Sequence, residues 1–365
     1  MIVLPALSGG GAERVALYLA EGLRDHGHEV ILVAFDAQGP YRDDVPTGVE
    51  LVDFATKDLK VGTKALRKLV EERRPDVINS HLDAVNLASI FVRLLVRPRP
   101  RVAITLHNGL ERQYMGDVPD WKKKRFKMMR VFFRFADAAI GVGPGVHADM
   151  VRLLGIRKDR AFAIENPVVT PGLAARAAQP IEDPWFGPDQ PPVIVAMGRL
   201  SPEKGFPMLL KAWSILEKRT DARLLILGEG SQRAELEALV DELRLDRDRV
   251  RLPGFVANPY AYLAKARLFA FSSVFEGTPL ALIEALACGL PVVSTDCTYG
   301  PRTILKDGEY GRLVPVGDHD AFAAAILEAL NETPKPAPPD ALAPYLLETA
   351  VLRYEQVLFP QRRES

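Results

Sequence analysis

Residues 192–205 read Pro-Val-Ile-Val-Ala-Met-Gly-Arg-Leu-Ser-Pro-Glu-Lys-Gly. The first six are mostly apolar and partly β-branched, which predicts a buried strand, and the glycines and proline that follow predict a loop. A segment with helical spacing of apolar residues comes next. The order strand, loop, helix is typical of parallel sheets wound by crossover helices.

The same order recurs along the chain. Strands are predicted at 2–4, 30–35, 49–53, 76–79, 102–106 and 138–142, and then at 192–197, 222–227, 250–252, 268–272, 291–295 and 312–314. Helical segments such as 12–25 and 83–95 separate them. The simplest interpretation is an α/β protein with two Rossmann-like, doubly wound parallel-sheet domains facing a cleft, with the ligand at the carboxyl ends of the strands.

The domain boundary is predicted in residues 166–191, which are rich in Pro, Ala and Gly, as linkers often are. This divides the chain into a first domain, 1–167, and a second domain, 168–340. A Pro-rich stretch at 333–344 precedes an amphipathic helix at 345–358. The C-terminal segment 341–365 could cross back to the first domain, but its composition does not decide between the two.

Composition is that of an ordinary globular protein, which excludes disorder, collagen and coiled coil. The 365 residues contain 47 Lys+Arg and 47 Asp+Glu. This zero sum hides segregation, because residues 1–167 carry 26 cations and 21 anions (+5), so the remainder carries −5. The two cysteines, Cys288 and Cys297, are too few for a disulfide framework, and reduced thiols are expected.

No apolar run approaches the ~18–20 residues of a membrane span, and the N-terminus lacks a signal-peptide pattern. A cytoplasmic protein is therefore expected. The chain starts abruptly in a predicted strand, Met1-Ile2-Val3-Leu4, which leaves the completeness of its N-terminus open.

Two glycine-containing loops are candidate phosphate sites. Ser8-Gly9-Gly10-Gly11 opens a helix whose first amides favour an anion, although a tight strand-to-helix turn explains it equally well. In the loop 198–205, Arg199 and Lys204 could clamp a diphosphate from two directions. The alternative for that loop is a solvated turn in which Glu203 pairs with a cation.

The stretch 275–285 reads Phe-Glu-Gly-Thr-Pro-Leu-Ala-Leu-Ile-Glu-Ala. Thr278 is predicted to cap a helix that starts at Pro279, which would leave the amides of Leu280 and the next residue for a second anion contact. Glu284 lies inside this apolar helix. An unpaired carboxylate is costly to bury, so Glu284 is expected to bind ligand hydroxyls or, alternatively, to pair with an arginine.

Together these motifs resemble those of retaining glycosyltransferases of family four, which have the two-domain GT-B fold. The matching pieces, in chain order, are Gly9-Gly10-Gly11-Ala12-Glu13-Arg14, His107-Asn108, Asn166-Pro167, Gly198-Arg199-Leu200, Glu203-Lys204-Gly205, Gly228-Glu229-Gly230, Gly254-Phe255 and the pair Glu276 and Glu284. Gly300-Pro301-Arg302 with Ile304-Leu305 resembles a subgroup that builds bacterial surface polysaccharides. The chain departs from that subgroup at Thr303, where Glu is frequent.

The resemblance implies a role for each matching position. Arg199 and Lys204 would neutralise the leaving diphosphate, aided by the helix start at Thr278, Pro279 and Leu280 and by the amides of Gly10 and Gly11. Glu276 would contact the transferred sugar. The remaining implied contacts are Glu284 to the ribose, the backbone near Phe255 and Val256 to the base, and His107 to sugar and acceptor.

No metal or other cofactor is expected, because fixed cations can stabilise the phosphate charge that develops as the bond to the anomeric carbon breaks. The Asp-x-Asp pairs that a metal-dependent transferase would use occur at 246–248 and 318–320. Turn and N-cap functions are the favoured interpretation of both. His26 and His28 are expected to complement a helix dipole, and His81 either to assist acceptor binding or to make a structural hydrogen bond.

The segment 121–134 contains seven cations and no acid, interleaved with Trp, Phe, Met and Val. This pattern is typical of a helix lying on anionic lipid, and the alternative is a solvated basic helix whose Phe132 and Phe133 enter the core. No nucleic-acid-binding signature accompanies the charge. The cations predicted to face the membrane are Lys122, Lys123, Lys124, Arg125, Lys127 and Arg130.

The sequence thus predicts a metal-independent, hexosyl-type retaining glycosyltransferase, peripheral on the inner face of the cell membrane. Its partners would be a nucleotide-sugar donor, with UDP as the expected nucleotide, and a lipid-linked or polysaccharide acceptor. Two alternatives remain: a nucleotide-sugar epimerase of the same fold, and a non-catalytic nucleotide-sugar-binding protein.

Overall fold

The structure is a computed structural model that describes residues 1–115 and 118–360. Its contacts divide the chain into two compact units. Unit 1 is Met1–Val168 together with the C-terminal segment from Pro344, and unit 2 is Val169–Ala343. Residues 361–365 of the predicted C-terminal segment lie outside the described part.

Unit 1 contains a seven-stranded parallel sheet in the order β3-β2-β1-β4-β5-β6-β7. The strands are β1 (Ile2–Ala6), β2 (Ile31–Asp36), β3 (Glu50–Asp53), β4 (Val77–His81), β5 (Arg101–Leu106), β6 (Ala138–Gly141) and β7 (Ala161–Ala163). The helices are α1 (Gly11–Asp25), α2 (Leu59–Arg73), α3 (Asp83–Leu95), α4 (Leu110–Tyr114), α5 (Asp120–Phe132), α6 (Pro144–Leu154) and α15 (Leu347–Leu358), with 3₁₀ turns η1 (Phe133–Phe135), η2 (Lys158–Arg160) and η6 (Ala343–Tyr345), the last of which spans the boundary between the units.

Unit 2 contains a six-stranded parallel sheet in the order β10-β9-β8-β11-β12-β13. Its strands are β8 (Val193–Met197), β9 (Arg223–Leu227), β10 (Val250–Gly254), β11 (Leu268–Phe271), β12 (Val292–Thr295) and β13 (Arg312–Val314). Its helices are α7 (Pro171–Ala177), α8 (Phe206–Leu216), α9 (Arg233–Glu242), α10 (Pro259–Lys265), α11 (Leu280–Ala287), α12 (Pro301–Ile304), α13 (His319–Asn331) and α14 (Pro339–Leu342), with 3₁₀ turns η3 (Pro184–Phe186), η4 (Pro202–Lys204) and η5 (Lys306–Gly308).

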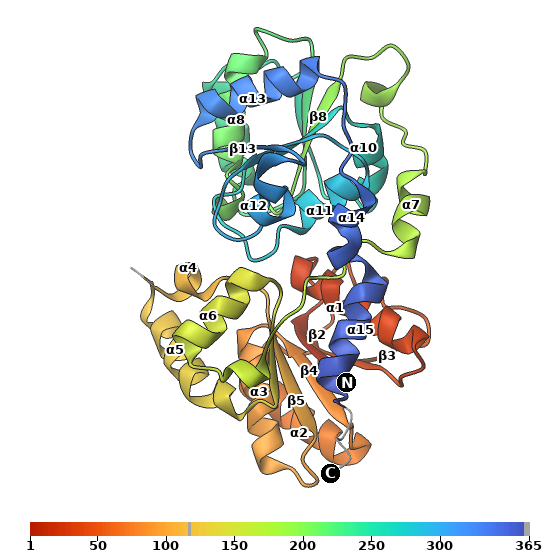
Figure 1. The fold of residues 1–365 in the computed structure, drawn as a ribbon, viewed down its shortest axis with the longest axis vertical. Coiled ribbons are helices and arrows are strands. Elements are labelled where there is room, and N and C mark those ends of the chain that lie inside the picture. The colour runs from red at the N-terminus through yellow and green to blue at the C-terminus, as the bar shows by residue number, and fades with distance from the viewer. Residues whose placement is uncertain (116–117, 361–365) are drawn as a thin grey trace. The chain divides into compact units, whose positions relative to one another are not determined.

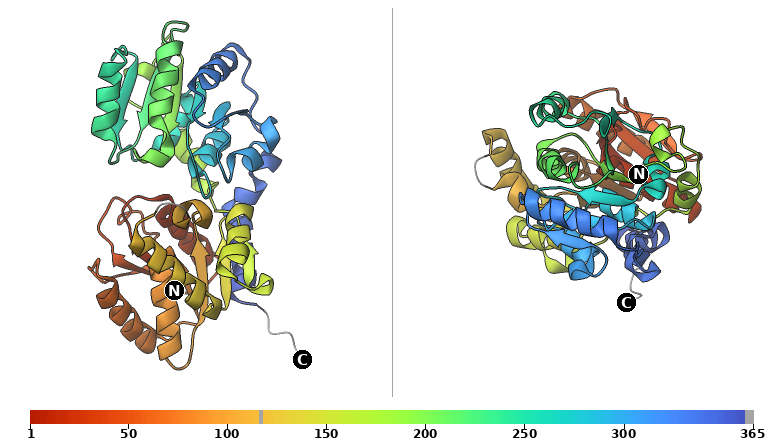
Figure 2. Two further views of the ribbon diagram at one scale, coloured as in Figure 1. Left: turned by 90° about the vertical axis from the view of Figure 1, so that its left-hand side faces the viewer. Right: turned by 90° about the horizontal axis from the view of Figure 1, so that it is seen from above.

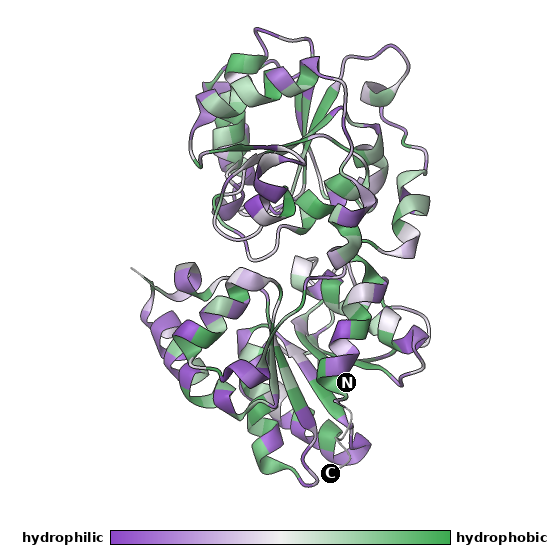
Figure 3. Cartoon of the chain, in the orientation of Figure 1, coloured by the Kyte–Doolittle hydropathy of each residue, from purple (hydrophilic) through white to green (hydrophobic). Residues whose placement is uncertain are grey.

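Within each unit the helices lie on both faces of the sheet (Figures 1 and 2). The inner strands are therefore buried on both sides and rich in apolar residues, which Figure 3 shows in green, whereas the edge strands β3, β10 and β13 are partly exposed. The predicted α/β class and the two doubly wound sheets are confirmed. All twelve predicted strands form, and their ends differ from the predicted ones by at most two residues. The short edge strand β7 was not predicted.

The C-terminal helix α15 packs on α1 of unit 1. Gly22 of α1 makes this approach possible, since a Cβ at that position would overlap Val351 Cγ2. Two arginines also hold the helix: Arg101 donates to the Val357 carbonyl (3.0 Å), and Arg353 donates to the Ala163 carbonyl (2.7 Å). This helix therefore completes the core of unit 1.

Candidate functional site

The strand order in unit 2 locates a ligand crevice. Numbered from its own first strand, the sheet has the order 3-2-1-4-5-6, so the chain turns in opposite directions after β8 and after β11. At such a switch point the loops diverge and leave a crevice at the carboxyl ends of the strands. The loop 198–205 follows β8, and the loop that contains Glu276 follows β11. The topology thus brings together the two stretches that the sequence singled out.

Hydrogen bonds to two backbone carbonyls join these loops. The Val274 amide donates to the Glu203 carbonyl (2.8 Å), and Ser272 Oγ donates to the Lys204 carbonyl (2.8 Å). Gly205 has φ +64°, and a Cβ there would overlap the Ser272 carbonyl oxygen. Only glycine therefore allows the loops to meet this closely.

Lys204 and Glu276 form an ion pair across these loops, with 2.7 Å between Lys204 Nζ and Glu276 Oε1. Ser273 Oγ donates to the same carboxylate oxygen (2.7 Å). The side chains are 21% and 9% exposed. Lys204, which is predicted to bind the diphosphate, and Glu276, which is predicted to contact the transferred sugar, thus lie in direct contact. The alternative was a loop in which Glu203 pairs with a cation. The structure instead shows Glu203 Oε1 accepting a hydrogen bond from Ser201 Oγ (2.6 Å).

Arg199 lies in the same loop with an exposed side chain. Within residues 1–115 and 118–360 its guanidinium makes no ion pair. The stem of Lys204 runs over Gly198, where a Cβ would lie 3.4 Å from its Cδ and Cε. The loop therefore presents one cation held by a carboxylate and one cation open to solvent.

The start of α11 differs from the prediction. Pro279, not Thr278, occupies the N-cap position, and the helix begins at Leu280. Pro279 has φ −77° and ψ 82°, a turn conformation in which the Leu280 amide donates to the Thr278 carbonyl (3.0 Å). Of the two amides predicted to contact an anion, that of Leu280 is therefore already hydrogen-bonded. The Ala281 amide has no acceptor among the described residues. Gly300 lies against this turn, where a Cβ would overlap Pro279.

Glu284 is buried inside α11, with 7% of its surface exposed. Tyr260 of α10 donates its hydroxyl to Glu284 Oε1 (2.9 Å). Tyr260 is thus one partner of this carboxylate, and the Arg176 guanidinium stacks on the Tyr260 ring at 4.7 Å. The contact of Glu284 with ligand hydroxyls remains a prediction.

Phe255 and Val256 follow β10. Phe255 is 51% exposed and Val256 is half-buried. Since β10 is two strands from β8, this edge lies about 10 Å from the loop of Arg199. That spacing suits contacts to different parts of one extended ligand.

In unit 1, the glycine loop after β1 is a helix cap. The Gly10 amide donates to the Glu13 carboxylate, to which Ser8 Oγ also donates (2.9 Å). Glu13 thus accepts from the Gly10 amide in the structure, and the anion contact expected at this amide stays a prediction. No such internal partner is found for the Gly11 amide in the described residues.

His107 lies just after β5, and a fully buried histidine of β4 contacts it. His81 Nδ1 is 2.9 Å from His107 Nε2, and His81 Nε2 is 2.9 Å from Asn79 Oδ1. Burial lowers the pKa of His107 to about 3. Burial, and then the nearby His107, lower the pKa of His81 well below its usual value. Both rings are therefore neutral, and His81 has the structural hydrogen bond that the sequence left as an alternative.

The Asp-x-Asp pairs make local contacts. Asp246 accepts from the Asp248 amide (2.9 Å), and Asp318 caps α13 by accepting from the Ala321 amide (2.9 Å). No group of three or more His, Cys, Asp or Glu side chains is placed to hold a metal ion in the part of the chain that the structure describes. Burial raises the pKa of Cys288 and of Cys297 to about 12, and both thiols are free.

The basic segment forms α5 and η1. The structure exposes Lys123, Lys124, Lys127 and Arg130, and it also exposes three apolar side chains, Trp121 (54%), Met128 (40%) and Val131 (49%). Two of the cations predicted to face a membrane instead pack against a neighbouring side chain. Lys122 and Arg125 are half-buried and lie over the Trp121 ring, at 5.8 and 4.9 Å. Phe133 enters the core.

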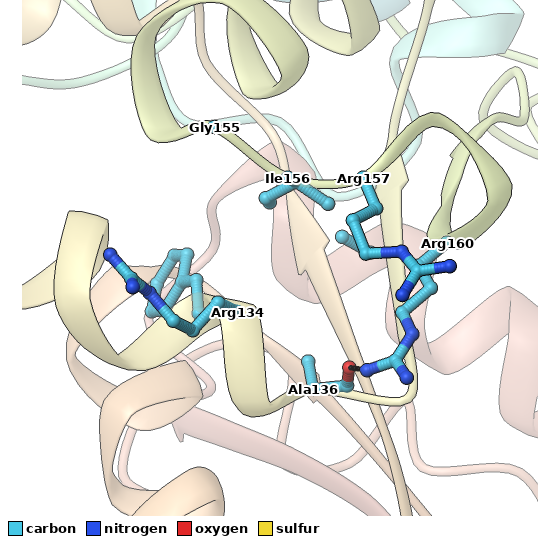
Figure 4. A pocket seen from close by; sticks show the side chains of 8 residues that line it. Arg134, Ala136, Gly155, Ile156, Arg157 and Arg160 are labelled. Carbon is cyan, nitrogen blue, oxygen red and sulfur yellow. Dashed lines mark hydrogen bonds between the residues drawn. The ribbon is translucent and has the colours of Figure 1, made fainter.

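A small pocket in unit 1 lies near the amino ends of β6 and β7, whereas His107 follows the carboxyl end of β5. Its lining includes Arg134, Ala136, Arg157 and Arg160, which precede β6 and β7 (Figure 4). Arg157 is paired with Asp159 (2.7 Å), and Arg160 donates to the Ala136 carbonyl (3.4 Å). Ligands of doubly wound sheets bind at the carboxyl ends, so this pocket is not part of the candidate site.

Sequence reasoning missed Ser273 and Tyr260. Ser273 is three residues before Glu276, a spacing that could have indicated the hydrogen bond. Tyr260 precedes Glu284 by 24 residues and lies on another helix, so no local signal connects the two.

Comparison with known proteins identifies the family. Residues 9–170 match the family model for Glycosyltransferase Family 4, and residues 191–332 match that for Glycosyl transferases group 1. A Campylobacter jejuni protein named as an N-acetylgalactosamine-N,N'-diacetylbacillosaminyl-diphospho-undecaprenol 4-alpha-N-acetylgalactosaminyltransferase is 34% identical over 207 residues, which cover 56% of this chain and 54% of that protein. The chain thus matches about half the length of that relative.

A lipopolysaccharide core biosynthesis glycosyltransferase of Rhizobium meliloti, LpsE, is 27% identical over 87% of this chain and 84% of that protein. Among solved structures, Anabaena HepE in complex with UDP and glucose superposes with a TM-score of 0.80 at 18% identity, over 98% of each chain. That likeness shows the fold alone. With family matches over most of both units, the chain belongs to the group 1 glycosyltransferases and has their GT-B fold.

Proposed function

We propose that the protein transfers a sugar, with retention of anomeric configuration, from a UDP-sugar to a lipid-linked or polysaccharide acceptor during cell-envelope glycan synthesis. The observation that carries the proposal is the pair of cations, Arg199 and Lys204, at the switch point of unit 2, next to Glu276. A departing nucleoside diphosphate develops negative charge, which fixed cations stabilise.

The ion pair suggests how the donor enters. Glu276 neutralises Lys204 in the structure, with 2.7 Å between Glu276 Oε1 and Lys204 Nζ. A diphosphate would replace Glu276 as the partner of Lys204. The Glu276 carboxylate would then be available to the hydroxyls of the attached sugar. Glu284 would bind the ribose, and the exposed Phe255 with Val256 would flank the base.

The names of relatives support the donor and acceptor classes. The Campylobacter protein is named for an alpha-linked product on a diphospho-undecaprenol lipid, and HepE was crystallised with UDP. Metal independence belongs to the same proposal, because Arg199 and Lys204 would supply the charge. Activity should then persist in a strong chelator.

The test is a panel of UDP-glucose, UDP-galactose and their N-acetylhexosamine analogues. A true donor should raise the melting temperature by mass action, because it binds only the folded chain. Incubation of that donor alone, followed by product analysis, separates the alternatives. An epimerase converts the sugar without acceptor, and a binding protein leaves it unchanged even when a membrane extract supplies acceptors.

We propose further that α5 docks peripherally on anionic lipid at the cytoplasmic side of the membrane. Exposed Lys124, Lys127 and Arg130 accompany exposed Trp121 and Met128 on this helix. Such a helix combines electrostatic attraction with shallow apolar insertion. No helix among the described residues is long and apolar enough to cross a bilayer.

Tryptophan fluorescence can test this docking. Of the three tryptophans, Trp121 is 54% exposed, whereas Trp185 and Trp213 are buried. Vesicles containing phosphatidylglycerol should shift the emission to the blue, and replacing Lys124, Lys127 and Arg130 by Glu should abolish the shift. The matched control replaces Lys60, Lys64 and Lys68 of α2, which are also exposed. Equal loss of binding in both variants would reject α5 as the docking element.

A further inference from the structure

The polar side chains at the carboxyl ends of β4 and β5 form a buried chain with a fixed direction. Asn79, His81 and Thr105 are at most 1% exposed, and His107 is 9% exposed. Asn79 Nδ2 lies 3.3 Å from the Ala103 carbonyl and 3.0 Å from Thr105 Oγ1. A backbone carbonyl can only accept, so the Asn79 amide must present its NH₂ group there.

This orientation determines the proton on each imidazole. Asn79 Oδ1 then faces His81 Nε2 at 2.9 Å and can only accept, so His81 carries its proton on Nε2. The Nδ1 atom of the neutral His81 is an acceptor, and His107 Nε2 lies 2.9 Å from it. His107 must therefore donate from Nε2, which leaves Nδ1 without a proton.

The Nδ1 atom of His107 is the free end of the chain. It has no hydrogen-bond partner among the described residues, and it is not one of their buried unpaired polar atoms, so water reaches it. A neutral ring in this tautomer offers a lone pair at that atom and no proton.

We propose that His81 is a positioning residue that holds His107 in the Nε2–H tautomer, so that His107 Nδ1 accepts a hydrogen bond from a substrate hydroxyl. This role rests on the proposed glycosyl transfer, in which a sugar or acceptor hydroxyl is the donor. His107 thereby selects hydroxyl donors at this point and supplies no proton to the leaving group.

The tautomer can be measured without substrate. In protein labelled with ¹⁵N-histidine, long-range ¹H–¹⁵N correlation distinguishes protonated from unprotonated ring nitrogens, and the spectrum of His107→Gln assigns the His107 signals. The wild type should show a protonated Nε2 and an unprotonated Nδ1. His81→Leu removes the acceptor and should give a tautomer mixture. His81→Asn places an amide oxygen near the former Nδ1 position and should restore the wild-type pattern.

Kinetics with the UDP-sugar found in the panel give the second readout. Loss of one neutral hydrogen bond corresponds to a kcat/KM about tenfold lower in His81→Leu, with recovery to within about threefold in His81→Asn. Circular dichroism establishes that both variants fold. A His107 protonated on Nδ1, or an unchanged tautomer in folded His81→Leu, would overturn the inference. The spectra need no turnover, so they test the tautomer independently of activity. An inactive protein with the expected tautomer would reject the transferase proposal and leave the assigned tautomer standing.

Discussion

At the scale of single residues, the candidate site depends on two cations in one loop. Lys204 is paired with Glu276, whose carboxylate also accepts a hydrogen bond from Ser273, and Arg199 is exposed. The sequence could identify both cations because a Gly- and Pro-containing loop after a strand is a local signal. It could not identify the Lys204–Glu276 contact, because the two residues are 72 positions apart and meet only through the pairing order of the strands.

Replacement of either cation should impair transfer. Arg199→Ala and Lys204→Ala should each lower kcat/KM about 100-fold or more, as expected when a charge partner of the transition state is lost. Lys211→Ala is the matched control, because Lys211 is an exposed lysine of α8 outside the site. Steady-state kinetics on folded variants provide the measurement, and near-normal turnover in Lys204→Ala would reject the diphosphate assignment.

At the scale of secondary structure elements, helix ends were the least predictable feature. The sequence favours Thr278 as a cap, but the turn at Pro279 ties the Leu280 amide to Thr278 and starts α11 later. His26 and His28 at the end of α1 were expected to complement the helix dipole. Both also bond Glu355 of α15, at 3.1 and 2.8 Å, a contact that local sequence cannot reveal.

The α1–α15 contact gives a stability prediction. Gly22→Ala should destabilise unit 1 by ~1–3 kcal/mol, because the added methyl group overlaps Val351 Cγ2, even though alanine favours a helix by up to ~1 kcal/mol. Gly172→Ala in α7 is the control, since nothing lies within 4 Å of its Cβ position. Denaturant unfolding should show Gly22→Ala as the less stable variant. If both substitutions stabilise equally, α15 does not pack as described.

The same contact should depend on pH. Hydrogen bonds to Glu355 and then Glu348 raise the pKa of His26 above its usual value. Its contribution to the free energy of unfolding is therefore fully present below the unfolded pKa of about 6.5 and is lost as pH rises through the folded pKa. The difference in the free energy of unfolding between wild type and His26→Gln should therefore shrink as the pH rises through that range.

Unfolding free energies measured across that pH range check this prediction. His147→Gln is the control, because His147 makes no ion pair among the described residues. A stability difference for His26→Gln that grows with rising pH would contradict the assigned contact.

At the scale of the whole molecule, the sequence predicted the class of the fold and its two sheets, because alternation of apolar strands and periodic helices is repeated many times. It missed β7, because the three residues Ala161–Ala163 include two alanines, which are depleted in strands, and no β-branched side chain. The zero net charge is a cancellation between a basic and an acidic portion, and the basic excess includes the exposed cations of α5.

NMR of the reaction distinguishes sugar transfer with retention from the other reactions. The donor identified by the panel is mixed with a lipid-linked glycan acceptor, and the anomeric coupling of donor and product is compared. We expect a new glycoside that forms only when donor and acceptor are both present and that has the anomeric configuration of the donor. An inverted product, or conversion of the donor sugar without acceptor, would contradict it.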